Sequence, residues 1–227
     1  MPKNKNLSNI TLVIPAKNEI ESLPKVLNEL KKYSVKKIIV IDPNDLGTIK
    51  SIKNYKCRII KQKKPGYGNA LMEGLSKVKT KYFCIFNADG SFNPKTLHKM
   101  HNNLNNNNFV FASRYMPKAG SDDDTFITLI GNKIFTLIGN IFFNLNISDI
   151  LFTYVGGNTN LANKLGLKNE SFGFCVELPI SIKKRNFSYT SIASHERKRI
   201  GGKKKVNAFR DGLIILIEMI KLFFKKN

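Results

Sequence analysis

The strongest constraint on the fold is the alternation of short apolar runs with segments of helical periodicity. Five runs that read as buried strands lie at residues 11–15, 37–42, 58–62, 82–89 and 109–114. The segments between them, such as 68–78 and 94–104, have the apolar spacing of helices. Strands that alternate with helices form a mostly parallel sheet that is covered on both faces. The predicted fold class is therefore α/β.

Polar or conformationally special residues follow each of the five runs. They are Pro15-Ala16-Lys17-Asn18-Glu19, Asp42-Pro43-Asn44-Asp45, the Lys/Gly loop 61–68, Asn87-Ala88-Asp89 and Ser113-Arg114-Tyr115. Ligands of such sheets bind beyond the carboxyl ends of the strands. We therefore expect the five strand ends to converge on one cleft that binds an anion and a metal ion.

The charge of the chain points to an anionic partner. Its 38 Lys and Arg against 16 Asp and Glu give a net charge of +22, which suits nucleic acid, acidic lipid or a phosphorylated small molecule. Scattered Lys is typical of a solvated surface, so the six Arg among these 38 residues are more informative. The sequence has no recognisable element for reading nucleic acid, and we expect no nucleic-acid partner.

Cysteine usage and the N-terminus predict the compartment. Three cysteines are an odd number, and Cys84 and Cys175 lie in apolar runs, which favours buried thiols in a reducing compartment. The polar start MPKNKNLSN lacks the apolar core of a secretory signal. We expect a cytoplasmic protein that lies peripherally on the cytoplasmic face of the membrane.

Two segments in the second half have amphipathic patterns. In residues 126–145, polar side chains recur every four residues, at Thr128, Asn132, Thr136, Asn140 and Asn144. This pattern fits a core helix with its polar edge toward solvent, or a helix at a membrane interface or beside an acceptor groove. Residues 206–224 confine their polar side chains to one narrow face. That segment fits an in-plane helix on an anionic membrane surface, or a helix packed on the body or on a partner subunit.

Motifs along nearly the whole chain resemble a known enzyme family. TLVIPAKNE, a second strand ending in Asp42, KPGYGNALMEG and IFNADGSFNP resemble the nucleotide-sugar half of family-2 glycosyltransferases with the GT-A fold. FASRY, ISDILFTY, FCVELPI and ERKRIGGKKKVNAFRDG resemble the acceptor half of the dolichol-phosphate mannosyltransferase branch. The resemblance implies a GT-A (Rossmann-like), mostly parallel sheet flanked by helices, with C-terminal amphipathic helices. It divides the chain into a nucleotide-sugar-binding α/β half (1–120), an acceptor-binding half of the same domain (121–205) and a C-terminal amphipathic helix (206–227).

The resemblance implies an inverting, metal-dependent glycosyltransferase. It would move a sugar from a nucleoside-diphosphate sugar to a polyprenyl phosphate, such as dolichyl or undecaprenyl phosphate. That acceptor is already anionic, so positioning and electrostatics would supply most of the rate. One alternative is a saccharide hydroxyl acceptor in cell-surface polysaccharide synthesis, for which Asp149 or Glu177 is the candidate base. Another is an inactive sugar-nucleotide-binding homologue.

The donor side of the site is expected in the first half of the chain. By resemblance, the base and ribose of the donor contact the turn after the first strand and the end of the second strand. The residues expected to bind the nucleotide sugar are Pro15, Ala16, Asn18, Glu19, Asp42, Gly68, Asn87 and Ala88. Glu19 also fits a charge at a helix N-terminus, and Asp42 a plain turn residue. The loop before Gly68 fits either an anion-binding loop or a simple tight turn.

Asn87-Ala88-Asp89 occupies the place of the family's Asp-x-Asp motif, which holds Mg²⁺ or Mn²⁺ on the donor diphosphate. Here Asn87 stands in place of the first Asp, and its amide oxygen can still ligate a hard cation. Asp89 is therefore the expected catalytic carboxylate and metal ligand. The run Asp122-Asp123-Asp124 could supply a further carboxylate, or it is an exposed acidic loop.

The acceptor side is expected to bind phosphate. By resemblance, Arg114, Arg197 and Arg199, with Lys203 and Lys205, contact phosphate on donor or acceptor, and guanidinium groups suit phosphate because they bind it in a bidentate way. The alternative for the later residues is a solvated basic tail. Asp149 matches the acceptor-loop Asp of the family. Glu177 lies in an apolar context, which suggests either a constrained catalytic carboxylate or a buried structural partner for Arg or Lys.

Overall fold

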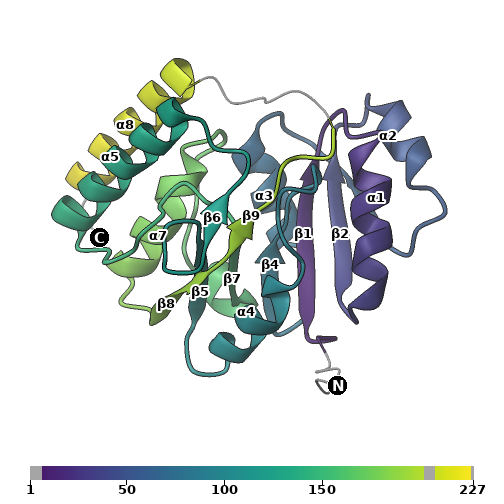
Figure 1. The fold of residues 1–227 in the computed structure, drawn as a ribbon, viewed down its shortest axis with the longest axis horizontal. Helices are drawn as coiled ribbons and strands as arrows, with labels where there is room; N and C mark the ends of the chain where they lie inside the picture. The colour runs from purple at the N-terminus through teal and green to yellow at the C-terminus, as the bar shows by residue number, and fades with distance from the viewer. Residues whose placement is uncertain (1–6, 202–207, 226–227) are drawn as a thin grey trace.

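The computed structural model describes residues 7–201 and 208–225. Its five N-terminal strands match the five predicted runs: β1 (Ile10–Ala16), β2 (Lys36–Ile41), β3 (Arg58–Lys61), β4 (Tyr82–Ile85) and β5 (Phe109–Ser113). With β7 (Val155–Asn158) and β8 (Tyr189–Ala193) they form one sheet in the order β3-β2-β1-β4-β7-β5-β8 (Figure 1). Only β7 runs antiparallel to its two neighbours. The predicted α/β class with a mostly parallel sheet is confirmed.

Helices cover both faces of this sheet because its strands are apolar on both sides. They are α1 (Ser22–Glu29), a 3-10 turn (Leu30–Lys32), α2 (Leu46–Ser51), α3 (Tyr67–Leu75), α4 (Thr96–Leu104), α6 (Thr159–Ala162) and α7 (Phe174–Lys184). In β1, Leu12 and Ile14 face the core beneath α1 and α4, whereas Val13 faces the core that α3 and α7 close. This alternation is the two-residue period of a strand. The division of the domain at residues 120 and 205 stays a prediction.

A second, two-stranded sheet brings two distant segments together. β6 (Gly120–Ser121) pairs in parallel with β9 (His195–Glu196) (Figure 1). The chain beyond β9 then crosses the turn that follows β4, where Arg197 N–H donates to the Ser91 carbonyl at 2.8 Å and Ile200 N–H to the Asp89 carbonyl at 2.8 Å. Residues 120–124, 89–91 and 195–200 are thereby fixed against one another.

Helix α5 (Phe126–Phe143) buries its polar side and exposes its apolar side, which is the reverse of an ordinary surface helix. Its polar residues Asn132 and Thr136 are buried, while Ile134 and Ile141 are 52% and 65% exposed. The interpretation of 126–145 as a core helix with its polar edge toward solvent is therefore wrong. The polar stripe faces the body of the protein, and the apolar side faces outward.

The buried stripe of α5 bonds an irregular loop, residues 144–151. Asn140 accepts the Ile147 N–H at 3.1 Å and donates to the Ile147 carbonyl at 2.9 Å, and Thr136 Oγ1 accepts the Ile150 N–H at 3.2 Å. Asn132 donates to the Asp149 carboxylate. Backbone groups of a buried loop need such partners. The polar spacing of α5 is therefore explained by the loop that it covers.

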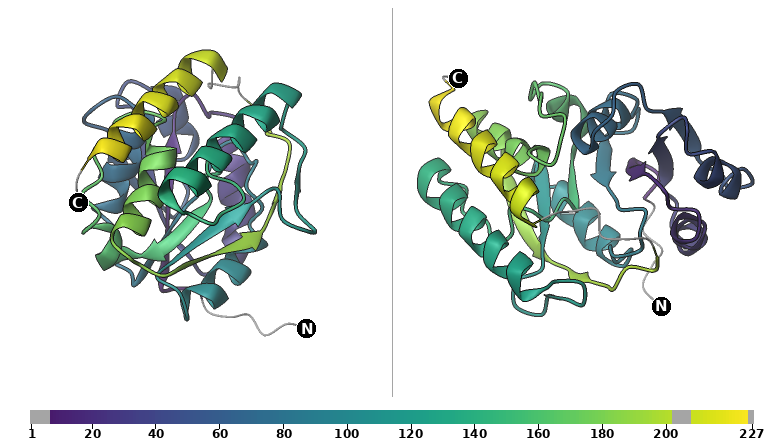
Figure 2. Two further views of the ribbon diagram at one scale, coloured as in Figure 1. Left: turned by 90° about the vertical axis from the view of Figure 1, so that its left-hand side faces the viewer. Right: turned by 90° about the horizontal axis from the view of Figure 1, so that it is seen from above.

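Helix α8 (Ala208–Phe224) lies beside α5 and packs on α7 (Figures 1 and 2). Ile215, Met219 and Leu222 form its buried side, while its other apolar side chains are largely exposed. Among the described residues, α5 has the length and composition of a membrane-spanning helix. However, the inner sides of both helices are bonded to or packed on the domain.

Because α5 buries its polar side, a substitution on that side should destabilise the protein more than a substitution on its exposed apolar side. Asn132→Leu should lower the free energy of unfolding by about 1–3 kcal/mol, because it removes a buried hydrogen-bonding group beside Asp149. The matched change Ile134→Asn on the exposed side should alter it by no more than about 0.5 kcal/mol. Urea denaturation of both variants tests this. A larger loss in Ile134→Asn than in Asn132→Leu would contradict the orientation described here.

Candidate active site

A cavity of about 570 Å³ lies at the carboxyl ends of the parallel strands. Residues at or just past the ends of all five N-terminal strands line it. They are Pro15 and Ala16 at the end of β1, Lys17, Asn18 and Glu19 after it, Asp42 after β2, Gln62, Pro65 and Gly66 after β3, Asn87, Ala88 and Asp89 after β4, and Arg114 after β5. The predicted convergence of the five strand ends is confirmed. Its lining also includes residues of α5, α8 and β9.

The turn after β1 is held rigidly against the start of α2. Asn18 adopts a left-handed backbone conformation (φ 54°), and its N–H donates to the Asp45 carboxylate at 2.6 Å. Glu19 is only 7% exposed, and its N–H donates to Thr48 Oγ1 at 2.9 Å. The Glu19 carboxylate accepts a hydrogen bond from Ser22, the first residue of α1. Glu19 therefore lines the cavity and also stands at the N-terminus of a helix, and its contact with the donor stays a prediction.

The loop after β3 is a tight turn whose amides are already used. The N–H groups of Lys63 and Lys64 donate to the Glu73 carboxylate at 3.0 and 3.1 Å. A Cβ atom on Gly68 would lie 1.9 Å from the Asn169 carbonyl oxygen, so only glycine allows this approach. Gly68 itself does not line the cavity. These contacts favour the tight-turn interpretation over an anion-binding loop.

Asp89 combines one oxygen held by the protein with one that faces a cation. Its Oδ1 accepts Ser91 N–H at 3.0 Å and Ser91 Oγ–H at 2.7 Å, and its Oδ2 lies 3.9 Å from the Arg199 guanidinium. The side-chain amide of Asn87 donates to Ser91 Oγ at 3.4 Å. In the described part of the chain no group of three or more His, Cys, Asp or Glu is arranged to hold a metal. Mg²⁺ commonly uses one or two carboxylates together with substrate phosphates, and Asp89 fits that mode.

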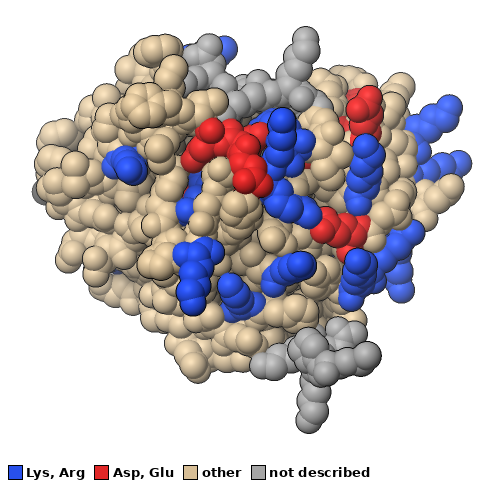
Figure 3. Space-filling view, in the orientation of Figure 1, with Lys and Arg blue, Asp and Glu red and all other residues tan. Residues whose placement is uncertain are grey.

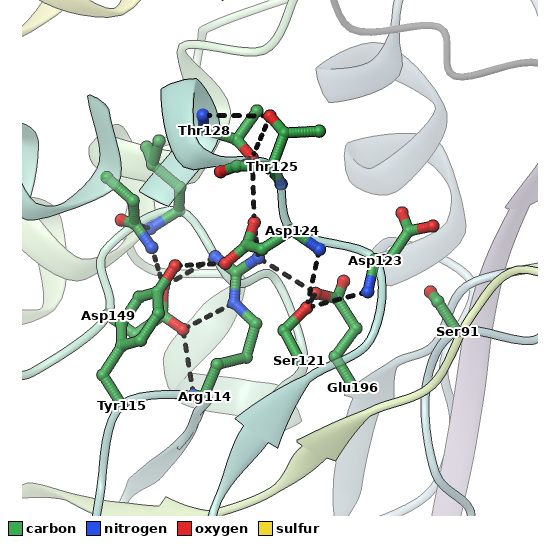
Figure 4. Close-up of polar contacts among 12 residues, drawn as sticks. Ser91, Arg114, Tyr115, Ser121, Asp123, Asp124, Thr125, Thr128, Asp149 and Glu196 are labelled. Carbon is green, nitrogen blue, oxygen red and sulfur yellow. Dashed lines mark hydrogen bonds and ion pairs between the residues drawn. The ribbon is translucent and has the colours of Figure 1, made fainter. Parts of the chain in front are cut away.

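Arg114 lies at the centre of a buried charge cluster (Figure 4). Its Nε and Nη2 bind the two oxygens of Asp149 at 2.8 and 3.0 Å, and its Nη1 binds Glu196 at 3.1 Å and Asp124 at 3.3 Å. The Asp149 side chain is 0% exposed and that of Arg114 is 10% exposed. Burial alone would lower the pKa of Arg114, but Asp149 and Glu196 outweigh it and raise that pKa. One guanidinium is thus surrounded by three carboxylates.

The acidic run before α5 is mostly turned inward. Asp123 and Asp124 line the cavity, with side chains 15% and 13% exposed. Ser121 Oγ accepts both of their N–H groups (Figure 4). Asp123 also binds Arg199 at 2.7 Å. Of this run only Asp122, at 55% side-chain exposure, fits the exposed acidic loop. For Asp123 and Asp124 that interpretation is wrong.

Several predicted acceptor residues lie elsewhere. Arg197 binds Glu29 at 2.7 Å and the Phe92 carbonyl at 2.9 Å, and it does not line the cavity. Lys203 and Lys205 fall outside the described residues. Of the three predicted phosphate-binding arginines, the structure brings Arg114 and Arg199 to the cavity.

The two predicted bases are also set back from the cavity. Asp149 stands behind Arg114, and Glu177, in the first turn of α7, accepts the N–H groups of Lys168 and Asn169 at 2.8 Å each. Burial raises the pKa of Glu177, although those N–H groups oppose the shift. Neither carboxylate lines the cavity. Glu177 is a structural carboxylate, but its hydrogen-bond partners are the backbone N–H groups of Lys168 and Asn169 rather than the Arg or Lys side chain that the alternative expected.

Sequence reasoning missed Glu196, which lines the cavity from β9. It is 8% exposed, and its Oε2 accepts Arg114 Nη1–H and Ser121 Oγ–H. Burial raises the pKa of Glu196, with Arg114 partly opposing the shift. The available signal was a lone carboxylate within the basic segment His195-Glu196-Arg197-Lys198-Arg199. An acidic residue within such a basic segment is a candidate for a buried ion-pair partner.

The cavity therefore has two chemically different ends. At one end, Glu19 and Asp42 offer carboxylates suited to the hydroxyl and amide groups of a nucleoside. At the other end, beside Arg114, lie the carboxylates of Asp124 and Glu196. Asp89 and Arg199 stand together at 3.9 Å and offer a place for a diphosphate and its cation.

Solved structures share this fold. Glucosyl-3-phosphoglycerate synthase from Mycobacterium tuberculosis, in complex with Mn²⁺, UDP and glucosyl-3-phosphoglycerate, has a TM-score of 0.75 at 13% identity, covering 96% of this chain and 81% of that chain. Mannosyl-3-phosphoglycerate synthase from Rubrobacter xylanophilus has a TM-score of 0.70 at 14% identity, covering 94% and 72%. At such low identities the likeness shows the fold, and it confirms the GT-A (Rossmann-like) prediction.

Sequence comparisons give the family. Rv0539, an uncharacterized glycosyltransferase of Mycobacterium tuberculosis (strain ATCC 25618 / H37Rv), is 26% identical over 211 residues, which are 92% of this chain and 94% of the relative. MJ1222 of Methanocaldococcus jannaschii is 32% identical over 102 residues, 42% of this chain. The model of the family described as "Glycosyl transferase family 2" matches residues 11–166. The dolichol-phosphate mannosyltransferase branch stays a prediction, but the match covers all strands of the main sheet except β8 and includes the cavity-lining ends of the five N-terminal strands, and the chain belongs to glycosyl transferase family 2.

Proposed function

We propose that this protein transfers a sugar from a nucleoside-diphosphate sugar to a hydroxyl group of its acceptor, with inversion at the sugar carbon. The observation that carries the choice of acceptor is the cluster around Arg114, whose guanidinium is already bound to Asp149, Asp124 and Glu196. An acceptor phosphate would add negative charge beside these carboxylates. A hydroxyl adds none, and it needs the base that a carboxylate supplies.

The donor would lie across the strand ends. Glu19 and Asp42 would accept hydrogen bonds from ribose and base, and Arg199 would face the diphosphate. Asp89, assisted by the amide oxygen of Asn87, would hold Mg²⁺ or Mn²⁺. When bound, that cation neutralises the charge that develops on the departing diphosphate. The fold neighbour solved with Mn²⁺ and UDP supports this arrangement by analogy.

Glu196 is the proposed base. Its buried carboxylate has a raised pKa, so its deprotonated form is a stronger base than an ordinary carboxylate. The acceptor oxygen would attack the sugar carbon from the face opposite the diphosphate, and the bond to the diphosphate oxygen would break. The hydroxyl proton would pass to Glu196. Arg114 and Ser121, both bonded to Glu196 Oε2, would orient the carboxylate for this transfer.

A polyprenyl phosphate acceptor is the second candidate, with one observation in its favour. The cavity lining includes Thr128 and Asn132 of α5 and Asp211 and Ile215 of α8, two helices with apolar outer sides. A lipid-linked acceptor could approach between them. This observation is equally compatible with a hydroxyl on a lipid-linked saccharide.

The metal role of Asp89 can be tested by ligand-induced stabilisation. With UDP and Mn²⁺ together at about 100 times their dissociation constants, the melting temperature of the wild type should rise by roughly 5–10 °C. Asp89→Asn should abolish the Mn²⁺-dependent part of this rise and lower transfer about 100-fold. The control Asp122→Asn, which changes an exposed carboxylate, should behave as the wild type. An unchanged Mn²⁺ effect in Asp89→Asn would refute the assignment.

The base role of Glu196 predicts a pH profile. A base works only when deprotonated, so a pKa raised above the usual value of 4.5 makes kcat/KM fall with acid at a higher pH than an ordinary carboxylate would. Glu196→Gln should reduce transfer to a hydroxyl acceptor about 10²- to 10⁴-fold and remove this acid limb. Glu170→Gln, on an exposed side chain, is the control. Transfer to polyprenyl phosphate that persists in Glu196→Gln would instead favour the second candidate.

We propose that Arg114 stabilises the cluster rather than binding phosphate. Arg114→Met should lower the free energy of unfolding by about 3–5 kcal/mol, because it leaves Asp149 buried without its cation. Arg197→Met, which breaks a partly exposed pair with Glu29, should cost about 1 kcal/mol. Urea denaturation compares the two. A stable Arg114→Met protein that has lost acceptor binding would show that Arg114 serves the substrate directly.

A further inference from the structure

The outer sides of α5 and α8 form a large exposed apolar surface. Of the 17 large hydrophobic side chains exposed in the described residues, 14 belong to these two helices. They are Phe126, Ile127, Ile130, Ile134, Leu137, Ile141 and Phe142 of α5 and Phe209, Leu213, Leu216, Ile217, Ile220, Phe223 and Phe224 of α8, here called the α5–α8 face. Monomeric proteins rarely leave such a contiguous surface in water, and it indicates an interaction site.

The two helices present this face as one layer. They lie side by side, in the foreground of the left view in Figure 2, with the sheet behind them. Phe223 of α8 packs edge-to-face on Phe142 and Phe143 of α5, with ring centroids 5.7 and 6.1 Å apart. The polar stripe of α5 is bonded to the loop beneath, so the helix cannot turn its apolar side inward without losing those bonds. The exposure is therefore built into the packing.

The charges on these helices select an anionic partner. Lys133 of α5 and Arg210 and Lys221 of α8 are exposed, whereas Asp211 of α8 is buried and Glu218 is partly buried. In Figure 3 the left-hand part of the molecule, where α5 and α8 lie, is mostly tan. A second copy of the chain would bring a net charge of +22 against +22. Anionic lipid headgroups are instead attracted to such cations, and acyl chains accept the apolar side chains.

We propose that the α5–α8 face docks on an anionic lipid bilayer, with both helices lying in the plane of the interface. Their inner sides remain on the domain, since the polar groups of α5 and the buried side of α8 hold them there. This orientation sets the cavity close to the membrane, because Asn132 and Ile215 of the same helices line it. Delivery of a lipid-linked hydroxyl acceptor through this contact rests on the proposed function. The docking itself does not.

The chain contains no Trp, which permits a direct optical test. Phe142→Trp places the only indole on the α5–α8 face, where Phe142 is 57% exposed, and Leu46→Trp places it on α2, where Leu46 is 70% exposed. On vesicles of phosphatidylcholine and phosphatidylglycerol, the Phe142→Trp emission should shift to the blue and be quenched by brominated acyl chains. The Leu46→Trp emission should change in neither respect. An unshifted Phe142→Trp emission would overturn the proposal.

Vesicle flotation measures the strength of docking. The wild type should float with phosphatidylglycerol-containing vesicles at low ionic strength and bind pure phosphatidylcholine at least about tenfold more weakly. The double variant Leu137→Glu/Ile217→Glu should lower partitioning at least about tenfold, because it removes two apolar contacts and adds two negative charges. Leu46→Glu is the matched control and should float as the wild type. Circular dichroism of each variant checks that the fold is retained.

Two further outcomes would overturn the docking proposal. One is a wild type that stays with the soluble fraction on both kinds of vesicle. The other is a lipid-free dimer that Leu137→Glu/Ile217→Glu dissociates, with no vesicle binding by the wild type, which would assign the face to a second copy. Transfer to a water-soluble hydroxyl acceptor, assayed without vesicles, separates the docking proposal from the proposed transferase function. If docking fails, this transfer can still persist, and if the transfer fails, docking can still be observed.

Discussion

The contact on which the site depends is the buried pair between Arg114 and Asp149. Arg114 follows β5, and Asp149 lies in the loop before β7, so the pair ties the carboxyl end of the sheet to the loop that α5 covers. Asp124 and Glu196 add the start of α5 and strand β9 to the same guanidinium. A buried charge must be paired, and a guanidinium with five N–H donors can pair with several carboxylates at once. Four segments far apart in the chain are thereby fixed around one cavity wall.

This cluster also explains the inverted helix. Asp149 needs a further hydrogen bond, which Asn132 of α5 donates, and the loop around Asp149 needs partners for its backbone groups, which Thr136 and Asn140 provide. A helix that turns its polar stripe toward such a loop has only its apolar side left to expose. The exposed apolar side of α5 that is proposed to bind the membrane and the cavity wall that is proposed to bind the acceptor thus both depend on the cluster around Arg114 and Asp149.

The distribution of charge separates the two ends of the cavity. A cation at the donor end, whether Arg199 or a divalent ion beside Asp89, suits a leaving diphosphate. At the acceptor end the carboxylates outnumber the guanidinium that they surround, which suits proton removal better than phosphate binding. The net charge of +22 gives no indication of this division, because most of it is carried by Lys outside the cavity lining.

The sequence by itself determined the mostly parallel α/β sheet, the five strand ends that meet at one edge, and the presence there of Glu19, Asp42, Asp89 and Arg114. These features follow from local periodicity and from the rule that parallel strands end together. The tertiary structure alone decided which side of α5 faces inward, that Arg197 pairs with Glu29, and that Glu196 reaches the cavity. The physical reason is that a hydrophobic pattern fixes the period of a helix but not which side is buried when a polar loop competes for it. Likewise, the partner of a charged side chain is set by contacts between residues such as Arg114 and Glu196, 82 positions apart, whose proximity no local pattern encodes.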